Sequence, residues 1–228
     1  MRISVIVPVY NEAEIIRPFI AGLMKTAAGY DHEVIVVDGA PGGGTLKRVE
    51  EPEVIKIAAR RGRGNQMNEG ASAATGEVLL FLHADTTLPH NAFSAVTNAL
   101  AEAKFVGGAF KLNIFPGGPL LGFISSSANL RARVARMPFG DQAIFIRKSY
   151  FDEIGGYKEP CLFEDLELMK RIRKLGGRIT ILGDPVATSS RRWQKEGVLY
   201  ATLRNGVIRT LYRLGVTAET LEKYYAHT

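Results

Sequence analysis

Hydrophobic residues in the first half of the chain recur with two different periods. Apolar residues repeat every three to four positions at residues 12–28 and 91–103, which predicts helices, and the small-residue segment 64–76 predicts another helix that Gly76 ends. Short, almost continuous apolar runs, which predict buried strands, lie at residues 2–9, 32–38, 53–59 and 77–83. Strands that are apolar on both faces and alternate with helices are typical of a mostly parallel sheet flanked by helices. The sequence therefore predicts an α/β fold.

The second half is less regular. Residues 106–119 predict a strand followed by a Gly/Pro turn, and residues 140–148 predict another strand. Residues 163–177 predict a helix that Gly176 ends. Its inward side chains are expected to be Leu166, Met169, Ile172 and Leu175. Two more helices are predicted, at residues 195–215 and 218–226, and no repeat or linker divides the chain.

Composition changes this picture little. The apolar runs are too short to cross a membrane, and Asn11 and Glu12 interrupt the N-terminal run before a signal-peptide core can form. A single cysteine, Cys161, excludes an intramolecular disulfide and favours a reducing compartment. Cys161 is also more typical of a small buried hydrophobe than of a nucleophile. We therefore expect a cytoplasmic protein of one domain, residues 1–228.

Basic charge is concentrated at the C-terminal end. The net charge is +6, and residues 166–228 contain 12 Lys or Arg against 5 acids. This surplus favours anionic partners such as phosphates or lipid headgroups, although a solvated helix face gives the same pattern. Tyrosines punctuate the segment at helical spacing, which indicates packing rather than the stacking platform of a nucleic-acid site: Tyr200, Tyr212, Tyr224 and Tyr225.

An apolar stripe accompanies these basic residues. It consists of Leu199, Leu203, Val207, Leu211 and Leu214, with Arg204, Arg209 and Arg213 around it. The commonest fate of such a stripe is burial against the core. The alternatives are cover of a substrate site, pairing with a second subunit, and contact with anionic lipid at the inner face of a membrane.

Polar side chains follow four successive strands at the point where each strand ends. They are Asn11 and Glu12, then Asp38, then Arg60 and Arg61, then His83 and Asp85. Any one of these could be a turn residue or a helix cap. Because ligands of parallel α/β sheets bind beyond the carboxyl ends of the strands, their recurrence predicts a binding site along that edge.

Known short motifs are missing from the same region. The stretch "GAPGGGTLK" lacks the Gly-Lys-Ser/Thr ending of a P-loop, and "GRGNQM" has Met67 where a dinucleotide fingerprint needs its third glycine. The sequence contains neither a Cys/His cluster of the metal-binding type nor a Gly-x-Ser-x-Gly elbow.

An ordered set of segments resembles the family 2 glycosyltransferases, most closely small soluble bacterial members with an "LHADT" element. The segments are "VIVPVYNE", "VIVVDGAPGGGT", "RGRGNQMNEGASAATGEVLLFLHADTTLP", "GDQAIFIRK", "GGY", "FEDLELMKRIRKLG" and "RRW". The resemblance runs from Ile3 to about Trp193. It implies the GT-A fold, with a nucleotide-binding half at residues 1–110, an acceptor and catalytic half at 111–193 and C-terminal helices at 194–228.

The resemblance also implies a nucleoside diphosphate sugar, UDP- or GDP-linked, as the donor. The positions that it assigns to the nucleotide and the donor sugar are Pro8, Tyr10, Glu12, Asp38, Arg60, Asn65, His83, Ala84, Asp141 and Gln142. Two of these segments depart from the family pattern. The glycine-rich loop after Asp38 lacks the usual Ser and Asp, and His83 stands where the family has the first acid of an Asp-x-Asp element.

Asp85 remains as the residue that the resemblance assigns to a divalent cation, Mn²⁺ or Mg²⁺. Asp165 matches the base of an inverting transfer, and Glu164 beside it is expected to raise its pKa. The acidic pair also suits the first turn of a helix. Glu164, Arg192 and Trp193 are assigned to the acceptor or its phosphate, although Trp193 could be a core residue.

The expected function is thus metal-assisted transfer of a sugar to an acceptor hydroxyl or phosphate, with inversion. Two alternatives stay open: a non-catalytic nucleotide-sugar-binding module, and a polyprenyl-phosphate glycosyltransferase at the membrane surface. We expect no nucleic acid as a partner. The acceptor stays undetermined, and peripheral membrane contact and a homodimer both stay open.

Overall fold

The computed structural model describes residues 1–158, 162–217, 220–221 and 224. Cys161 and most of the helix predicted at residues 218–226 lie outside the described residues. Within them, no helix is long and apolar enough to cross a membrane.

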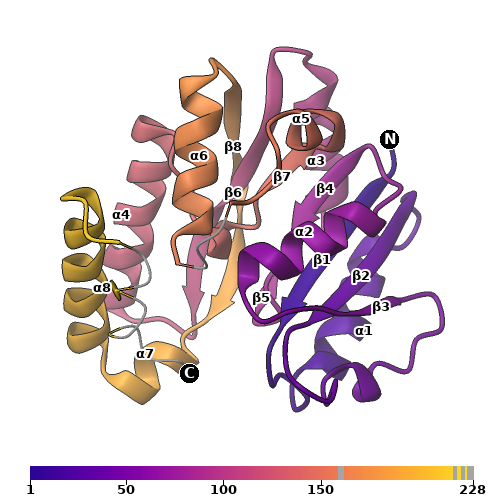
Figure 1. Cartoon of the computed structure of the whole chain (residues 1–228), viewed down its shortest axis with the longest axis horizontal. Coiled ribbons are helices and arrows are strands. Elements are labelled where there is room, and N and C mark those ends of the chain that lie inside the picture. The colour runs from indigo at the N-terminus through magenta and orange to yellow at the C-terminus, as the bar shows by residue number, and fades with distance from the viewer. Residues whose placement is uncertain (159–161, 218–219, 222–223, 225–228) are drawn as a thin grey trace.

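One sheet runs through the molecule (Figure 1), with the strand order β3-β2-β1-β4-β7-β6-β8-β5. Its strands are β1 (Ile3–Val9), β2 (His32–Asp38), β3 (Ile55–Ala58), β4 (Val78–Phe81), β5 (Thr86–Thr87), β6 (Phe105–Phe115), β7 (Phe145–Arg147) and β8 (Arg178–Ser189). The first four strands are mutually parallel, and so are β6 and β8. Strand β7 joins the two groups by running antiparallel to β4 and β6. The predicted α/β fold with a mostly parallel sheet is confirmed.

Helices cover both faces of this sheet (Figure 1). They are α1 (Ile16–Ala27), α2 (Arg63–Ala73), α3 (Ala92–Ala101), α4 (Pro119–Ala135), α5 (Lys148–Glu153), α6 (Glu164–Lys174), α7 (Arg191–Glu196) and α8 (Val198–Arg213), with 3-10 turns at Leu46–Arg48 and Gly140–Gln142. One hydrophobic cluster joins the sheet to α1, α3 and α4, and the other joins it to α2, α5 and α6. Strand β1 is apolar on both faces apart from Ser4, because Ile6 enters the second cluster and the other members enter the first: Ile3, Val5, Val7 and Val9.

Local sequence misled the prediction at several places in the second half. Only Phe145–Arg147 of the strand predicted at 140–148 is extended, because Gly140–Gln142 forms a 3-10 turn and Ala143 has φ 47°. The predicted helix 195–215 is two helices, separated at Gly197, whose φ of 84° suits glycine. Leu175 is 59% exposed rather than inward, since α6 ends at Lys174. Leu166, Met169 and Ile172 are buried as predicted.

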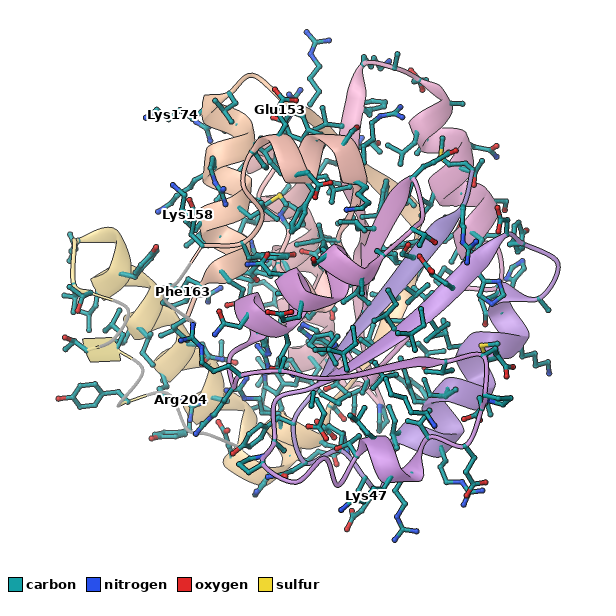
Figure 2. All side chains as sticks on the ribbon, turned by 45° about the vertical axis from the view of Figure 1, so that its right-hand side comes forward. Lys47, Glu153, Lys158, Phe163, Lys174 and Arg204 are labelled. Atoms are coloured by element: carbon teal, nitrogen blue, oxygen red, sulfur yellow. The ribbon has the colours of Figure 1, made fainter. Side chains whose placement is uncertain are left out.

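Helix α8 packs beside the start of α6 and the turn before β7. The Tyr212 ring lies 4.7 Å from the Phe163 ring, and Arg204 Nη2 lies 2.6 Å from Glu196 Oε2 of α7. Figure 2 shows Phe163 and Arg204 at the border between α8 and the rest of the molecule. The inner face of α8 therefore carries the aromatic and ionic contacts, together with the buried Ala201 and Ile208.

The apolar stripe of α8 faces solvent. Leu199 is 65% exposed, Leu203 68%, Val207 58% and Leu214 76%, and Leu211 is exposed as well. The prediction that this stripe packs against the core is wrong, because the opposite face of the helix makes the internal contacts. Tyr200 is exposed too, contrary to the packing predicted from its spacing.

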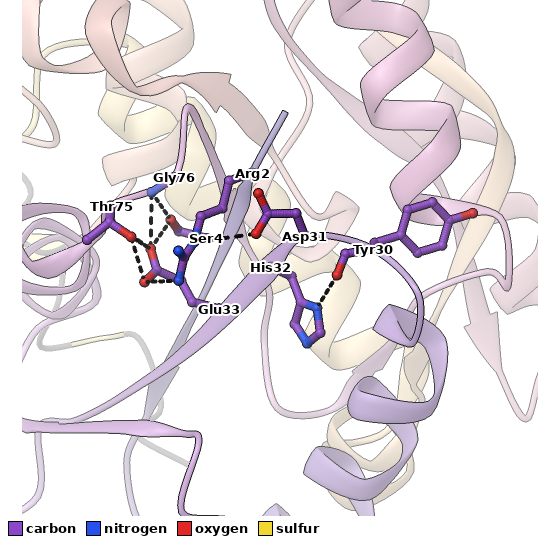
Figure 3. A network of polar contacts seen from close by, with 8 residues as sticks. All are labelled: Arg2, Ser4, Tyr30, Asp31, His32, Glu33, Thr75 and Gly76. Atoms are coloured by element: carbon purple, nitrogen blue, oxygen red, sulfur yellow. Dashed lines mark hydrogen bonds and ion pairs between the residues drawn. The ribbon is translucent and has the colours of Figure 1, made fainter.

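A buried carboxylate closes the opposite edge of the sheet, where β1 and β2 begin (Figure 3). Glu33 Oε1 accepts hydrogen bonds from Ser4 Oγ at 2.6 Å and from the backbone N–H of Thr75 at 2.6 Å and Gly76 at 3.1 Å. Burial by itself raises the pKa of Glu33, but these hydrogen bonds outweigh it and hold the pKa below its ordinary value. The network joins β1, β2 and the end of α2 far from the carboxyl edge.

Replacing Glu33 by glutamine is expected to lower the free energy of unfolding by about 1–3 kcal/mol at pH 7, because charge-assisted bonds are lost. Since the folded-state pKa is depressed, this stability is present above the unfolded pKa and is lost as pH falls through the folded pKa. Urea unfolding of both proteins across acid pH measures it. Asp31→Asn, which changes an exposed neighbour, is the matched control. Parallel curves for wild type and Glu33→Gln would contradict the expectation.

Candidate functional site

The carboxyl ends of the first four strands lie at one edge of the sheet. Val9 is paired with Asp38, Asp38 is paired with Ala58, and β4 runs parallel to β1. The loops that follow these strands therefore begin side by side, as the sequence predicted. The structure brings the segments with Tyr10, Asp38, Arg60 and Asp85 together at this edge.

Asp38 is a buried residue that stabilises the loop after β2. Its side chain is buried, with Oδ1 accepting from the N–H of Ala40 at 2.8 Å and Oδ2 from the N–H of Thr45 at 3.3 Å. Thr45 Oγ1 in turn accepts from the N–H of Glu12 at 3.1 Å. Pro8 is buried within β1 just before this point. Asp38 thus holds the loops after β1 and β2 in a fixed relation, which shapes any pocket formed between them.

An exposed tyrosine and two exposed arginines lie beside these loops. The Arg61 guanidinium stands 4.9 Å from the centre of the Tyr10 ring, which is 37% exposed. Asn65 Nδ2 donates to the carbonyl of Arg61 at 3.3 Å, so Asn65 helps to fix this turn, and Arg60 next to it is exposed. An exposed aromatic ring and arginines suit a planar or anionic ligand.

His83 and Asp85 follow β4, with the buried Ala84 between them. Burial, followed by the positive charge of Arg63, lowers the pKa of His83 to about 4, although Asp85 acts in the opposite direction. The imidazole is therefore neutral near pH 7. Asp85 Oδ1 accepts from Thr86 Oγ1 at 3.3 Å, and the Asp85 carbonyl accepts from the N–H of Ser189 at 2.9 Å.

Asp165 is held at the start of α6 by two backbone donors. Its Oδ2 accepts from the N–H of Gly140 at 2.8 Å and its Oδ1 from the N–H of Leu166 at 2.6 Å. Burial raises the pKa of Asp165 against these bonds. A side chain at Gly140 would place its Cβ 3.1 Å from His83 Nε2 and 3.8 Å from Asp165 Oδ2. Gly140 is thus the point where His83 and Asp165 approach each other.

Two more carboxyl groups near Asp165 have raised pKa values. Burial and the neighbouring Asp165 raise the pKa of Glu164 to about 7 and that of Asp141 to about 6. Asp141 Oδ1 is buried without a hydrogen-bond partner among the described atoms. Gln142, predicted to line the donor site, is fully buried and bonds to the backbone of Phe110 and Phe139, so it supports the turn that carries Asp141.

Arg63 is a residue of the site that the sequence reasoning left unassigned. It is the first residue of α2, and its positive charge lowers the pKa of five groups, although burial is the largest influence on each of them. These are Glu12, His83, Asp141, Glu164 and Asp165. Its position inside the basic turn "RGRG", between two glycines at a predicted helix start, was the available signal. The charge of Arg63 therefore acts on more groups of this cluster than the charge of Arg131 or Arg191 does.

The "RRW" element approaches the cluster through a different residue than predicted. Arg191 Nη2 lies 3.8 Å from Glu12 Oε2. Burial raises the pKa of Glu12, and the positive charge of Arg191 lowers it by a smaller amount. Arg192 instead points to Glu196, with 3.5 Å between Nε and Oε1. Trp193 is partly buried against the hydrophobic cluster on the α1 face. The structure thus places Arg191, not Arg192, beside the strand-end loops.

Carboxyl groups outnumber arginines in the cluster. Five carboxyl groups lie there with three arginines: Glu12, Asp85, Asp141, Glu164 and Asp165 with Arg63, Arg131 and Arg191. Among the described residues, no three His, Cys, Asp or Glu side chains are arranged to hold a metal ion by themselves. Asp85 with a neutral His83 fits a divalent cation only when a bound anion supplies further oxygen ligands, as Mg²⁺ and Mn²⁺ commonly require.

Proteins of one family resemble this chain. The family model for glycosyl transferase family 2 matches residues 4–158. An uncharacterized glycosyltransferase of Nostoc sp. is 31% identical over 123 residues, a match that covers 51% of this chain. The same match covers 38% of the Nostoc protein, so the similarity extends over less than half of that relative's length.

Solved structures share the fold. A mannosyltransferase from Pyrobaculum calidifontis, in complex with GDP-Man and Mn²⁺, aligns with a TM-score of 0.67 and 23% identity over 91% of this chain and 60% of its own. Residues 1–349 of S. aureus TarS, in complex with UDP, align with a TM-score of 0.65 and 21% identity over 83% and 60%. These likenesses confirm the GT-A fold. Since the family model covers more than half of its residues, this chain belongs to glycosyl transferase family 2.

Proposed function

We propose that this chain transfers a sugar from a nucleoside diphosphate sugar to an acceptor hydroxyl or phosphate, with inversion and with the help of a divalent cation. The observation that carries the proposal is the cluster at the carboxyl edge of the sheet. In it, Asp165 and His83 both lie next to Gly140, and Asp85 comes two residues after His83 in the chain. The UDP and GDP-Man complexes of proteins with the same fold support a nucleotide donor.

Asp165 is the general base of the proposed reaction. Its carboxylate takes the proton of the acceptor hydroxyl while the acceptor oxygen forms a bond to the anomeric carbon. The bond from that carbon to the diphosphate breaks, and the diphosphate leaves with the electron pair. Because the reaction is a single displacement at the anomeric carbon, the configuration of that carbon is inverted. The raised pKa of Asp165, caused by burial, makes it a stronger base than an exposed aspartate.

Arg63 at the N-terminus of α2 stabilises the negative charge of the diphosphate, because its guanidinium and the positive end of the helix dipole both attract the phosphate oxygens. Arg61 and Tyr10 offer the aromatic and cationic surface for the base. Asp85, with the neutral His83 beside it, would hold the cation, which when bound neutralises charge on the leaving diphosphate. Asp38 keeps the base-side loops in place.

The test is donor binding with and without the cation. Wild type is expected to bind one of UDP, GDP or their sugars in Mn²⁺, with thermal stabilisation of about 2.7 kcal/mol at 100 times Kd. Asp85→Ala is expected to lose the Mn²⁺-dependent part of the affinity, and His83→Ala to weaken it less. Asp31→Ala, an exposed carboxylate at the opposite edge, is the control.

Calorimetry of each variant in Mn²⁺ and in excess chelator separates the two parts of the proposal. Equal nucleotide affinity in Mn²⁺ and in chelator would show that the cation has no role in donor binding. Stabilisation by none of the nucleotides would reject the nucleotide-sugar donor.

A further inference from the structure

Gln66 is a buried polar residue on the face of α2 that packs on the sheet. It is 3% exposed, and two other residues of that helix face, Met67 and Ala71, belong to the hydrophobic cluster between α2 and the strands. Figure 1 shows α2 lying across β1 and β2. A buried side-chain amide costs free energy unless it is hydrogen-bonded, so the bonds of Gln66 show which parts of the molecule it holds together.

The side-chain amide of Gln66 joins the carboxyl ends of β1 and β2. Its Nε2 donates to the carbonyl of Val9 at 2.7 Å and to the carbonyl of Val37 at 2.8 Å. Val9 is the last residue of β1, and Val37 is the last but one of β2. Because one NH₂ group uses both of its hydrogens in this way, a single side chain of α2 fixes the position of both strand ends.

Gly39 leaves the space that the Gln66 amide occupies. A Cβ atom at Gly39 would lie 2.9 Å from Cδ and Oε1 of Gln66 and 3.2 Å from the Cα atom of Arg61. The backbone of Gly39 is not left-handed, so the glycine provides room rather than an unusual conformation. Its N–H donates to the Val9 carbonyl at 3.0 Å, the same oxygen that Gln66 binds. The loop after β2 therefore begins at the atom on which Gln66 is anchored.

The residues that follow these two carbonyls belong to the proposed donor site. Tyr10 comes directly after Val9, and its ring lies 4.9 Å from the Arg61 guanidinium. Asp38 comes directly after Val37, and its carboxylate accepts hydrogen bonds from two N–H groups of the loop after β2. A shift of either strand end would therefore move the surface proposed for the nucleotide base.

Gln66 also lies one turn from the start of α2. Arg63 is the first residue of the helix, about 4.5 Å from Gln66 along the helix axis at 1.5 Å per residue. The same side chain thus connects the helix start proposed for the diphosphate with the strand ends proposed for the base. A nucleoside diphosphate has a fixed covalent length. Both of its ends can be bound at once only when these two parts of the protein keep their spacing.

We propose that Gln66 is a positioning residue for the nucleotide. It does not touch the ligand, but its amide sets the spacing between the loops after β1 and β2 and the start of α2. This inference rests on the proposed function, because it concerns the site of the same donor. Since a displacement of about 1 Å in a binding site costs as much as about 10²-fold, loss of the amide is expected to weaken nucleotide binding by at least about tenfold.

Gln66→Met tests the proposal, because methionine is of similar length and cannot donate either hydrogen bond. Asn68→Leu is the matched control. Asn68 is a second amide of α2, and it makes two bonds to the backbone of Tyr157, at 2.8 Å and 2.9 Å, instead of to the strand ends. Both variants are expected to have a lower melting temperature. Only Gln66→Met is expected to lose affinity for UDP or GDP, measured by calorimetry in Mn²⁺ at a temperature where all variants are folded.

Gly39→Ala is a second variant, which displaces the Gln66 amide instead of removing it. It is expected to weaken binding of the same nucleotide, and it keeps the test open if Gln66→Met does not fold. Amide hydrogen exchange, measured by NMR relative to the amides of β4, tests the positioning without any nucleotide. Gln66→Met is expected to speed exchange at Gly39, whereas Asn68→Leu is expected to speed it at Tyr157.

The two measurements separate this inference from the proposed function. Binding of neither UDP nor GDP by wild type would reject the proposed donor, and the exchange rates would still decide whether Gln66 holds the strand ends. The positioning role is overturned by unchanged exchange at Gly39 in Gln66→Met. It is also overturned if Gln66→Met and Asn68→Leu bind the nucleotide with affinities within about twofold of each other, since Gln66 would then act on stability alone.

Discussion

Replacing Asp165 by asparagine is expected to slow sugar transfer by about 10²- to 10⁴-fold, the usual cost of losing a positioned base. Asparagine keeps the size of the side chain but cannot take a proton from the acceptor. Donor affinity is expected to stay nearly unchanged, because the groups proposed to contact the nucleotide, such as Tyr10 and Arg61, are untouched. Single-turnover transfer and donor calorimetry on the same preparation provide the two measurements.

Glu164→Gln is the matched control for this substitution. It removes the adjacent carboxyl group, which has its own pKa near 7, and leaves both hydrogen bonds of Asp165 in place. Its expected effect is a shift of the pH–rate profile and a smaller loss of rate. Near-normal transfer by Asp165→Asn would assign the proton transfer to another group, of which Asp141 is the next candidate.

Asp141→Asn is expected to raise the free energy of unfolding by about 1–3 kcal/mol at pH 8 in chelator, because it removes a buried charge with an unpartnered oxygen. The pKa of Asp141 is raised from 3.8 to about 6, chiefly by burial and then by Asp165. Between these values the folded state retains a proton that the unfolded state has lost, so wild-type stability falls as pH rises through this range.

The substitution is therefore expected to be neutral below about pH 4, where aspartate is protonated in both states, and most stabilising above pH 6. Part of the slope remains in the variant, because Glu164 titrates near pH 7. Urea unfolding from pH 4 to pH 8 measures the difference, with Asp152→Asn, an exposed carboxylate of a surface ion pair, as control. The same slope in wild type and variant would show that Asp141 ionises normally.

Local patterns determined the first half of the fold. The short, almost continuous apolar runs of β1, β2 and β4 and the helical period of α1 are properties of short segments, and the carboxyl ends of neighbouring parallel strands lie at one edge. That was enough to bring Tyr10, Asp38, Arg60 and Asp85 together and to place Asp165 at a helix start. The order of the motifs was enough for the family.

Strand β8 shows why the second half resisted prediction. Gly183 and Pro185 interrupt its apolar pattern, and it is extended because it pairs with β6, far away in the sequence. Likewise the approach of His83 and Asp165 at Gly140 joins segments from three parts of the chain, which no local period records.

The influence of Arg63 on its neighbours and the exposure of the α8 stripe were decided in the same way. Arg63 is itself exposed, and the packing of α2 against the start of α6 brings its charge close to Glu164, which no local pattern records. An apolar stripe on a helix predicts that this helix face will be covered, but it does not identify what covers it. The sequence by itself determined the strands, the sheet edge that they share and the family. The tertiary structure decided which charged groups lie together at that edge and which helix faces are exposed to water, because these properties depend on contacts between segments that are distant in the sequence.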